Sequence, residues 1–252
     1  MNMKYRRVLK SIVAFSLLSI LSVINCSQPI DKNTIFLKGT WQFQTDPEDT
    51  GIKQNWYLSK LKDTINLPGS MKDNNKGNEV TVNTIWTGSI YDSSWFFRED
   101  MAKYRQKDNL KLPFWLTPNR HYIGVAWYQR EVEIPAHWEG QKIESFLERP
   151  HWETTLWVDT IKIGMQNSLS TPHRHDLSKI LTPGIHIISI RVDNRIKEIN
   201  VGPDSHSITD QTQGNWNGIV GNICLKATSP VFFDDIKLFT NIEKKSVNRL
   251  HP

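Results

Sequence analysis

The strongest indication of the fold is the stretch Trp127-Tyr128-Gln129-Arg130-Glu131-Val132-Glu133-Ile134-Pro135. Its side chains alternate between two faces: Ala126, Tyr128, Arg130, Val132 and Ile134 share one, and Trp127, Gln129, Glu131 and Glu133 share the other. A period of two among β-branched and aromatic residues predicts a strand in a sheet that is covered on at least one side. Pro135 has no N–H to donate to a neighbouring strand, so the strand is expected to end there.

Arg130 places a charge among the apolar positions of this strand, and a buried charge needs a fixed partner. Glu148 follows Phe146 at strand alternation, and we expect it to pair with Arg130. The alternative is that Glu148 is a catalytic acid, but an ion pair between neighbouring strands is the commoner explanation. We therefore assign structural roles to Arg130 and Glu148, and also to Trp127 on the opposite face.

The net charge of +5 is concentrated near the start of the chain. Lys4, Arg6, Arg7 and Lys10 supply four of these charges, which leaves +1 for the other residues (5 − 4). A surface that follows a phosphate backbone needs a concentrated basic surplus. Nucleic acid is therefore not an expected partner.

An apolar run from Ile12 to Ile24 follows these basic residues and is too short for a comfortable bilayer span. Cys26 ends the run. The arrangement resembles a bacterial lipoprotein signal, in which the cysteine is lipidated after cleavage, although Asn25 stands where such signals usually have a small residue. A plain secretory signal is the alternative. We interpret residues 1–26 as a signal segment and 27–33 as a tether. The protein is expected to be exported to the periplasm or outer membrane, with a lipid at Cys26 as its only membrane attachment.

Short strands are predicted at regular spacing along most of the chain. The clearest are residues 126–134, 142–147, 154–158, 161–165, 185–192 and 219–226, preceded by strands within 36–43 and 65–70. Turn signals about every 8–12 residues and little helix favour a β-sandwich or jelly roll. Residues 52–61 are the exception, since they predict a short helix that buries Trp56 and Leu61.

Aromatic residues are scattered through the irregular segment 71–119. They include Trp86, Tyr91, Trp95, Phe96, Phe97 and Trp115. Such residues stack on sugars or cover a sheet, and cover is the commoner role. After Pro230, a new alternation from Val231 to Thr240 predicts one strand, which cannot bury its own face. Residues 229–252 are therefore expected to begin a further domain.

Six motifs follow one another along the chain: Leu37-x-Gly39-x-Trp41-x-Phe43, Leu67-Pro68-Gly69-Ser70, Tyr122 to Val132, Leu156-Trp157-Val158-Asp159, Arg191-Val192-Asp193-Asn194 and Gly214 to Ile219. Together they resemble family 2 glycoside hydrolases, which include β-galactosidases, β-glucuronidases and β-mannosidases. The similarity covers residues 34–228 and is greatest to bacterial, glucuronidase-like members. It implies an all-β fold, a galactose-binding-like jelly-roll β-sandwich. The resemblance also implies that 229–252 begin an incomplete immunoglobulin-like domain.

The resemblance implies retaining hydrolysis of a terminal β-linked sugar without a cofactor. Two carboxylates about 5–5.5 Å apart perform this chemistry. In the family, both are glutamates of a (β/α)₈ barrel that follows the jelly roll and the immunoglobulin-like domain. We expect this chain to end before the barrel, to lack the catalytic glutamates and to supply one wall of an active site. The barrel and a carbohydrate are then its expected partners.

The loop from Gly202 to Asn217 precedes the Gly-Ile strand. In the family, this loop directs an acidic residue toward the sugar. Asp210 is the best match here and Asp204 is its rival. The neighbouring candidates for sugar binding are His206, Asn215 and the aromatic Trp216. The alternative is an ordered polar turn with no ligand.

His173 and His175 give a second candidate site, because a His-x-His spacing places both imidazoles on one strand face. Some jelly rolls bind metal in this way, but no third ligand is evident here and Asp176 is adjacent rather than alternate. No metal site is therefore assigned. A free-standing surface carbohydrate-binding module remains the main alternative function, and a metal-dependent jelly-roll enzyme is a weaker one.

Overall fold

The computed structural model describes residues 31–87, 97–111, 117–197, 205–206, 209–210, 214–233, 236–241 and 246–250. The predicted signal segment, with Cys26, lies outside these residues. Within the described part of the chain, none of the helices has the length and apolarity to cross a membrane.

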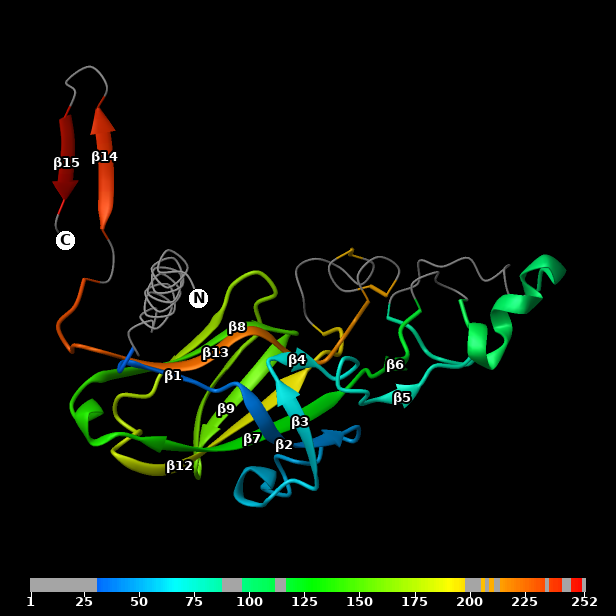
Figure 1. The fold of residues 1–252 in the computed structure, drawn as a ribbon, viewed down its shortest axis with the longest axis horizontal. Coiled ribbons are helices and arrows are strands. Elements are labelled where there is room, and N and C mark those ends of the chain that lie inside the picture. Colours follow the sequence, from blue (N-terminus) through cyan, green and yellow to red (C-terminus); the bar gives the residue numbers. More distant parts are fainter. Residues whose placement is uncertain are drawn as a thin grey trace, which may run out of the picture. The chain divides into compact units, whose positions relative to one another are not determined.

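Six antiparallel strands form the larger sheet (Figure 1), in the order β10-β9-β12-β7-β2-β3. They are β10 (Ile161–Gln166), β9 (Glu153–Val158), β12 (Gly184–Asp193), β7 (Val125–Ile134), β2 (Gly39–Asp46) and β3 (Asp63–Leu67). Strand β7 is the one predicted from the opening stretch, and it lies inside the sheet. It pairs with β12 from Ile134 opposite Gly184 to Val125 opposite Asp193.

The second sheet has the order β1-β13-β8-β11, with β4 paired to β13. Its strands are β1 (Thr34–Phe36), β13 (Gly218–Thr228), β8 (Lys142–Pro150), β11 (His173–Asp176) and β4 (Gly69–Ser70). A small two-stranded ribbon joins β5 (Asn78–Glu79) to β6 (Arg120–His121). Short 3₁₀ turns lie at Trp56–Leu58, Glu99–Arg105, Lys107–Asn109 and Ala136–Trp138.

The main hydrophobic core joins the two sheets. Tyr128 and Leu156 of the larger sheet pack in the same cluster as Leu147 and Ile223 of the smaller one. Burial of such side chains is the dominant favourable contribution to folding, about 25 cal/mol per Å² of apolar surface. The predicted all-β jelly-roll sandwich is thus confirmed.

The outer face of β7 has a second, smaller apolar cluster. Trp127 packs with Val125, Trp157 and Leu61, and the loop between β2 and β3 covers them. The Trp127 indole donates to Asp46 Oδ2 at 3.0 Å. Farther along the same face, Glu131 is exposed. Both faces of β7 are therefore covered at its start and only one at its end.

The helix predicted over residues 52–61 is wrong, because only one 3₁₀ turn forms there. The carboxylate of Asp46 accepts the N–H groups of Thr50 and Gly51, each at 2.8 Å, and so curls the loop around itself. Asn55 then takes a left-handed conformation with φ 54° immediately before the 3₁₀ turn, so a continuous α-helix cannot run through it. Leu61 is buried as expected.

The expected pairing of Arg130 with Glu148 is also wrong, because the two residues lie on strands of different sheets. Arg130 Nη1 donates to the carbonyls of Leu37 and Lys38, at 3.0 and 2.8 Å. Glu148 Oε2 instead accepts the backbone N–H and the side-chain amide of Asn222, at 2.7 and 2.9 Å. Arg130 therefore fixes the link between β1 and β2, and Glu148 fixes an irregularity in β13.

The strand predicted over Val231–Thr240 is shorter than expected. Strand β14 spans Lys237–Asn241 and pairs with β15 (Ser246–Leu250), which the sequence pattern did not indicate. Val231–Phe233 precede it without strand structure. This end of the chain therefore has a hairpin rather than a single strand.

Candidate functional site

Asp210 anchors the candidate loop to a distant segment. Its side chain is 2 % exposed. Oδ2 accepts the backbone N–H of Thr87 at 2.6 Å, and Oδ1 accepts the N–H of Asn215 at 2.7 Å. Hydrogen bonds from N–H groups to a carboxylate are among the stronger ones in proteins. Asp210 therefore ties residues 209–210 and 214–215 to the end of the segment that contains Thr87.

Asn215 extends this attachment. Its side-chain amide donates to Thr87 Oγ1 at 3.0 Å and to the carbonyl of Asn194 at 2.8 Å. Asn194 in turn accepts the N–H of Gly124 at 2.8 Å and donates to the carbonyl of Tyr122 at 2.8 Å. The loop is therefore connected to the segments at the ends of β7 and β12.

Asn217 closes the loop onto the sandwich core. Its amide donates to the carbonyls of Gly124 and Val192, at 3.0 and 3.2 Å. Its Oδ1 accepts the hydroxyl of Tyr128 at 2.7 Å. Burial raises the pKa of Tyr128, so this hydroxyl stays protonated and remains a donor.

Ion pairs hold the segment around Asn194. Arg191 and Arg195 each contact both Asp49 and Asp193, and Lys197 contacts Asp193 at 2.7 Å. Burial by itself raises the pKa of Asp193, but hydrogen bonds from Arg195 and Lys197 outweigh it and hold the pKa well below its usual value. The carboxylate therefore stays charged and keeps the end of β12 in place.

His121 lies beside Asp210, with Nε2 3.9 Å from Oδ2. Its ring packs on Trp86, with centroids 4.8 Å apart. Burial lowers its pKa more than the attraction of Asp210 raises it. His121 also interacts with the backbone of Ile85 through a hydrogen bond, which leaves one of its ring nitrogens and Oδ1 of Asn215 buried without a hydrogen-bond partner among the described residues. Such orphaned polar atoms are rare in folded proteins and point to a missing partner.

Trp216 is supported by His151. The two rings stack with centroids 4.6 Å apart and planes inclined by 20°. His151 Nδ1 also lies 2.7 Å from the Trp216 carbonyl oxygen. Trp216 is half-buried, and His206, the other aromatic candidate, is exposed. Asp204 lies outside the described residues.

Sequence reasoning therefore missed two residues at this site. The sequence motifs assign no role to His151 or to His121. No pattern in the sequence marks His121, because it follows the irregular segment and reaches Asp210 only through the β5–β6 ribbon. Of the aromatic residues in 71–119, Trp86 is buried and Phe97 is exposed. Tyr91, Trp95, Phe96 and Trp115 lie outside the described residues.

His173 and His175 share the buried face of β11, as their spacing predicts. His173 Nδ1 lies 2.6 Å from Thr154 Oγ1, and its Nε2 lies 3.0 Å from the Ser168 carbonyl oxygen. Burial, and secondarily His173, lowers the pKa of His175 to about 4. Across the described ranges, no group of three or more His, Cys, Asp or Glu side chains is placed to hold a metal ion.

Residues 35–229 match the protein family described as glycosyl hydrolases family 2, sugar binding domain. The chain belongs to this family. The resemblance inferred from the sequence motifs is thereby confirmed. This family 2 domain is 21 % identical over 225 residues to a β-glucuronidase of Paenibacillus borealis. The alignment covers 83 % of this chain and 32 % of the relative. It is 20 % identical over 235 residues to mouse β-glucuronidase, and this alignment covers 82 % of this chain and 31 % of the mouse protein.

Solved structures show the same fold. A β-glucuronidase from an uncultured Clostridium species superposes with a TM-score of 0.56 at 17 % identity, covering 85 % of this chain and 33 % of that one. The Ruminococcus gnavus β-glucuronidase in complex with D-glucuronic acid gives 0.53 at 18 % identity, covering 78 % and 30 %. The family 2 chain described here therefore spans about a third of the length of the relatives it matches.

Proposed function

We propose that this chain is the sugar-binding part of an exported, β-glucuronidase-like family 2 glycoside hydrolase. Its end around Asp210 forms one wall of a site for a terminal β-linked sugar, and the two catalytic glutamates come from a barrel outside residues 34–228. The family membership and the share of its relatives that the chain spans support this proposal. A uronic acid is the favoured sugar, because the relatives are named β-glucuronidases.

The observation on which this proposal rests is the set of orphaned polar atoms beside Asp210. Asn215 Oδ1 and one ring nitrogen of His121 lack partners among the described residues. Each unsatisfied buried group costs about 1–3 kcal/mol. A sugar hydroxyl both donates and accepts hydrogen bonds, so it satisfies either an imidazole nitrogen or an amide oxygen.

Asp210 then acts chiefly as a positioning residue. Its carboxylate is almost fully buried and holds the N–H groups of Thr87 and Asn215. The side chains that it positions, Asn215 and Trp216, are the proposed contacts to the sugar. His206 and Asp204 are proposed to complete this surface. Trp216, with His151 stacked on its ring, offers an aromatic ring to a sugar face.

Hydrolysis and binding separate this proposal from the alternative of a free-standing carbohydrate-binding module. We expect the purified chain to leave 4-nitrophenyl β-D-glucuronide intact. Addition of a family 2 catalytic barrel as a separate polypeptide is expected to restore hydrolysis. Replacement of Trp216 by Ala then reduces kcat/KM at least about tenfold, the effect of one lost stacking contact. Hydrolysis by the chain alone, or a Trp216→Ala variant with unchanged kcat/KM, contradicts the proposal.

Export and the lipid anchor need a separate experiment. We propose that Cys26 is lipidated, so metabolic labelling with a radioactive fatty acid should label the chain and Cys26→Ser should remove the label. Cys224→Ser is the matched control and keeps the label, because Cys224 is buried in the fold. Absence of label in the wild-type protein contradicts the anchor and favours a plain secretory signal.

A further inference from the structure

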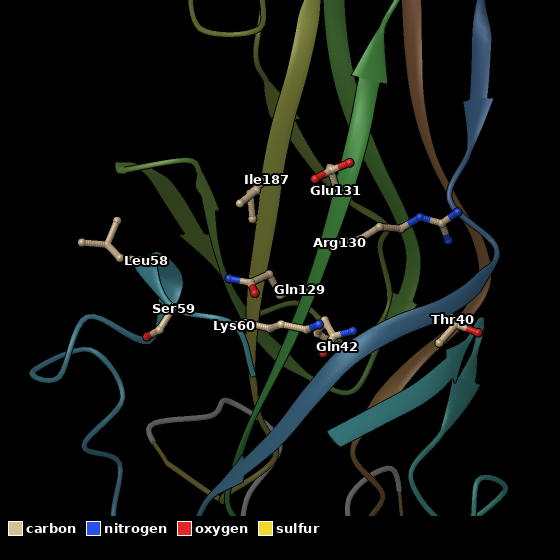
Figure 2. Close-up of a pocket in the computed structure, with 9 residues that line it drawn as sticks. All are labelled: Thr40, Gln42, Leu58, Ser59, Lys60, Gln129, Arg130, Glu131 and Ile187. Atoms are coloured by element: carbon tan, nitrogen blue, oxygen red, sulfur yellow. The ribbon is translucent and has the colours of Figure 1, made fainter. Parts of the chain in front are cut away.

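A depression lies on the outer face of the larger sheet, far from Asp210 along β7. Its volume is about 480 Å³. Strands β2, β7 and β12 form its floor, and residues 58–60 of the β2–β3 loop form one wall (Figure 2). The lining residues are Thr40, Gln42, Leu58, Ser59, Lys60, Gln129, Arg130, Glu131 and Ile187. This volume lies within the range of small-molecule sites, about 300–1,000 Å³.

Gln129 presents a fixed acceptor to this depression. The residue is 6 % exposed. Its Nε2 donates to Ser189 Oγ at 3.2 Å and to the Tyr57 carbonyl at 3.4 Å, which uses both N–H groups and sets the orientation of the amide. Oε1 accepts no hydrogen bond from the described residues and is available to a ligand in the depression.

Three more polar side chains line the same depression. Gln42 comes from β2, Glu131 from β7 and Lys60 from the loop, as Figure 2 shows. Among the described residues, none of the three side chains makes a hydrogen bond or an ion pair. They supply an amide, a carboxylate and an ammonium group from three separate segments. Donors and acceptors therefore surround one space.

Arg130 does not add charge to this space. Its guanidinium donates to the carbonyls of Leu37 and Lys38 and so is already engaged. Lys60 and Glu131 remain, and their charges balance. Leu58 and Ile187 add apolar surface to the lining. A strongly charged ligand therefore gains little here.

We propose that this depression is a second carbohydrate site, which binds a neutral oligosaccharide through the side chains of Gln42, Lys60, Gln129 and Glu131. Sugar hydroxyls need donors and acceptors side by side, which the amides, ammonium and carboxylate supply. The C–H faces of a pyranose pack on apolar carbon such as that of Leu58 and Ile187. In an enzyme that acts on polysaccharide, such a site retains the chain while the sugar at its end is cleaved.

This site is distinct from the one in the proposed function. Val125 is at the end of β7 that lies opposite Asp193, next to Asn194. Gln129 and Glu131 are four and six residues farther along the strand. At about 3.3 Å per residue, this places them roughly 13–20 Å from that end. The lining of the depression shares no residue with the Asp210 cluster. Either site can therefore be tested without the other.

Isothermal titration of the chain with cellotetraose, xylotetraose and tri-galacturonate tests the proposal. A neutral oligosaccharide is expected to bind more tightly than tri-galacturonate. The double variant Lys60→Ala/Glu131→Ala should weaken that binding at least about tenfold, which corresponds to two lost hydrogen bonds. The double variant Lys62→Ala/Glu133→Ala is the matched control, because these exposed residues lie two positions further along the same segments. It should bind within about twofold of wild type.

Three outcomes overturn the proposal. The first is no binding of either neutral oligosaccharide at about 10 mM, a concentration that detects even weak millimolar affinity. The second is equal weakening by the control variant. The third is binding that survives Lys60→Ala/Glu131→Ala but is lost in Trp216→Ala, which assigns the sugar to the Asp210 end. If the proposed function fails, because Trp216→Ala leaves kcat/KM unchanged, the loss of oligosaccharide binding in Lys60→Ala/Glu131→Ala is still expected. The two proposals can therefore fail separately.

Discussion

The carboxylate of Asp210 accepts the backbone N–H of Thr87 at 2.6 Å, although 123 residues separate the two in the sequence. The same carboxylate holds Asn215, which precedes the first residues of β13 by three positions. One side chain thus brings the candidate loop, the irregular segment before β6 and the start of a sandwich strand together. The geometry of the site depends on this contact.

Replacing Asp210 by Ala should therefore destabilise the fold as well as the site. Two buried N–H groups lose a charged acceptor, and we expect the free energy of unfolding to fall by about 3 kcal/mol. Urea denaturation measures this change. Asp108→Ala, in an exposed 3₁₀ turn, is the control and should change it by less than about 0.5 kcal/mol. Equal stability of the two variants contradicts the anchoring role.

Arg130 and Glu148 should behave independently in a double-mutant cycle. Arg130→Met removes two hydrogen bonds from a cation to backbone carbonyls, so we expect a loss of about 1.5–3 kcal/mol. Glu148→Gln acts on Asn222 instead. The effects of the single variants should add to within about 0.5 kcal/mol, as measured by urea denaturation. A larger coupling energy indicates a direct ion pair, contrary to the structure.

Gly218 should tolerate no side chain, because its φ is +142° and an added Cβ meets the Gly69 carbonyl oxygen at 2.5 Å. We expect Gly218→Ala to lower stability by about 3 kcal/mol or more, since both strain and a backbone clash arise. Gly140→Ala separates the two causes. Gly140 has φ +72° with open space around it, so only about 1 kcal/mol of strain is expected. Thermal unfolding of both variants measures the difference, and equal melting temperatures refute it.

His175 should make the sandwich less stable in mild acid. Its pKa is lowered to about 4 in the folded chain, whereas an unfolded histidine titrates near 6.5. The unfolded state therefore binds more protons between these values, so stability is full above about pH 6.5 and falls toward pH 4. The slope is at most about 1.4 kcal/mol per pH unit.

Urea denaturation between pH 7 and pH 4.5 measures this slope. His175→Gln removes the contribution of His175 and should flatten the profile, although His173, whose pKa burial also lowers, keeps its own share. His137→Gln is the matched control at an exposed position and should retain the wild-type slope. An unchanged slope in His175→Gln contradicts the assignment.

Most strands could be predicted from the sequence, because alternation is a local property. The faces of β7 follow directly from which of its residues are apolar, and Pro135 marks its end. The loop at 47–62 escaped prediction for a physical reason. Its amphipathic pattern fits a helix, but the buried carboxylate of Asp46 takes the N–H groups of Thr50 and Gly51 and coils the chain differently.

Local periodicity and ordered motifs were sufficient to predict most of the strands, the alternation of β7 and the family to which residues 35–229 belong. The partners of Arg130 and Glu148, and the position of His121 beside Asp210, became evident only from the folded chain. Those contacts depend on which strands are neighbours in each sheet and on how the connecting segments fold back. A polar side chain accepts any suitable partner within reach, and the assembled fold fixes which partner that is.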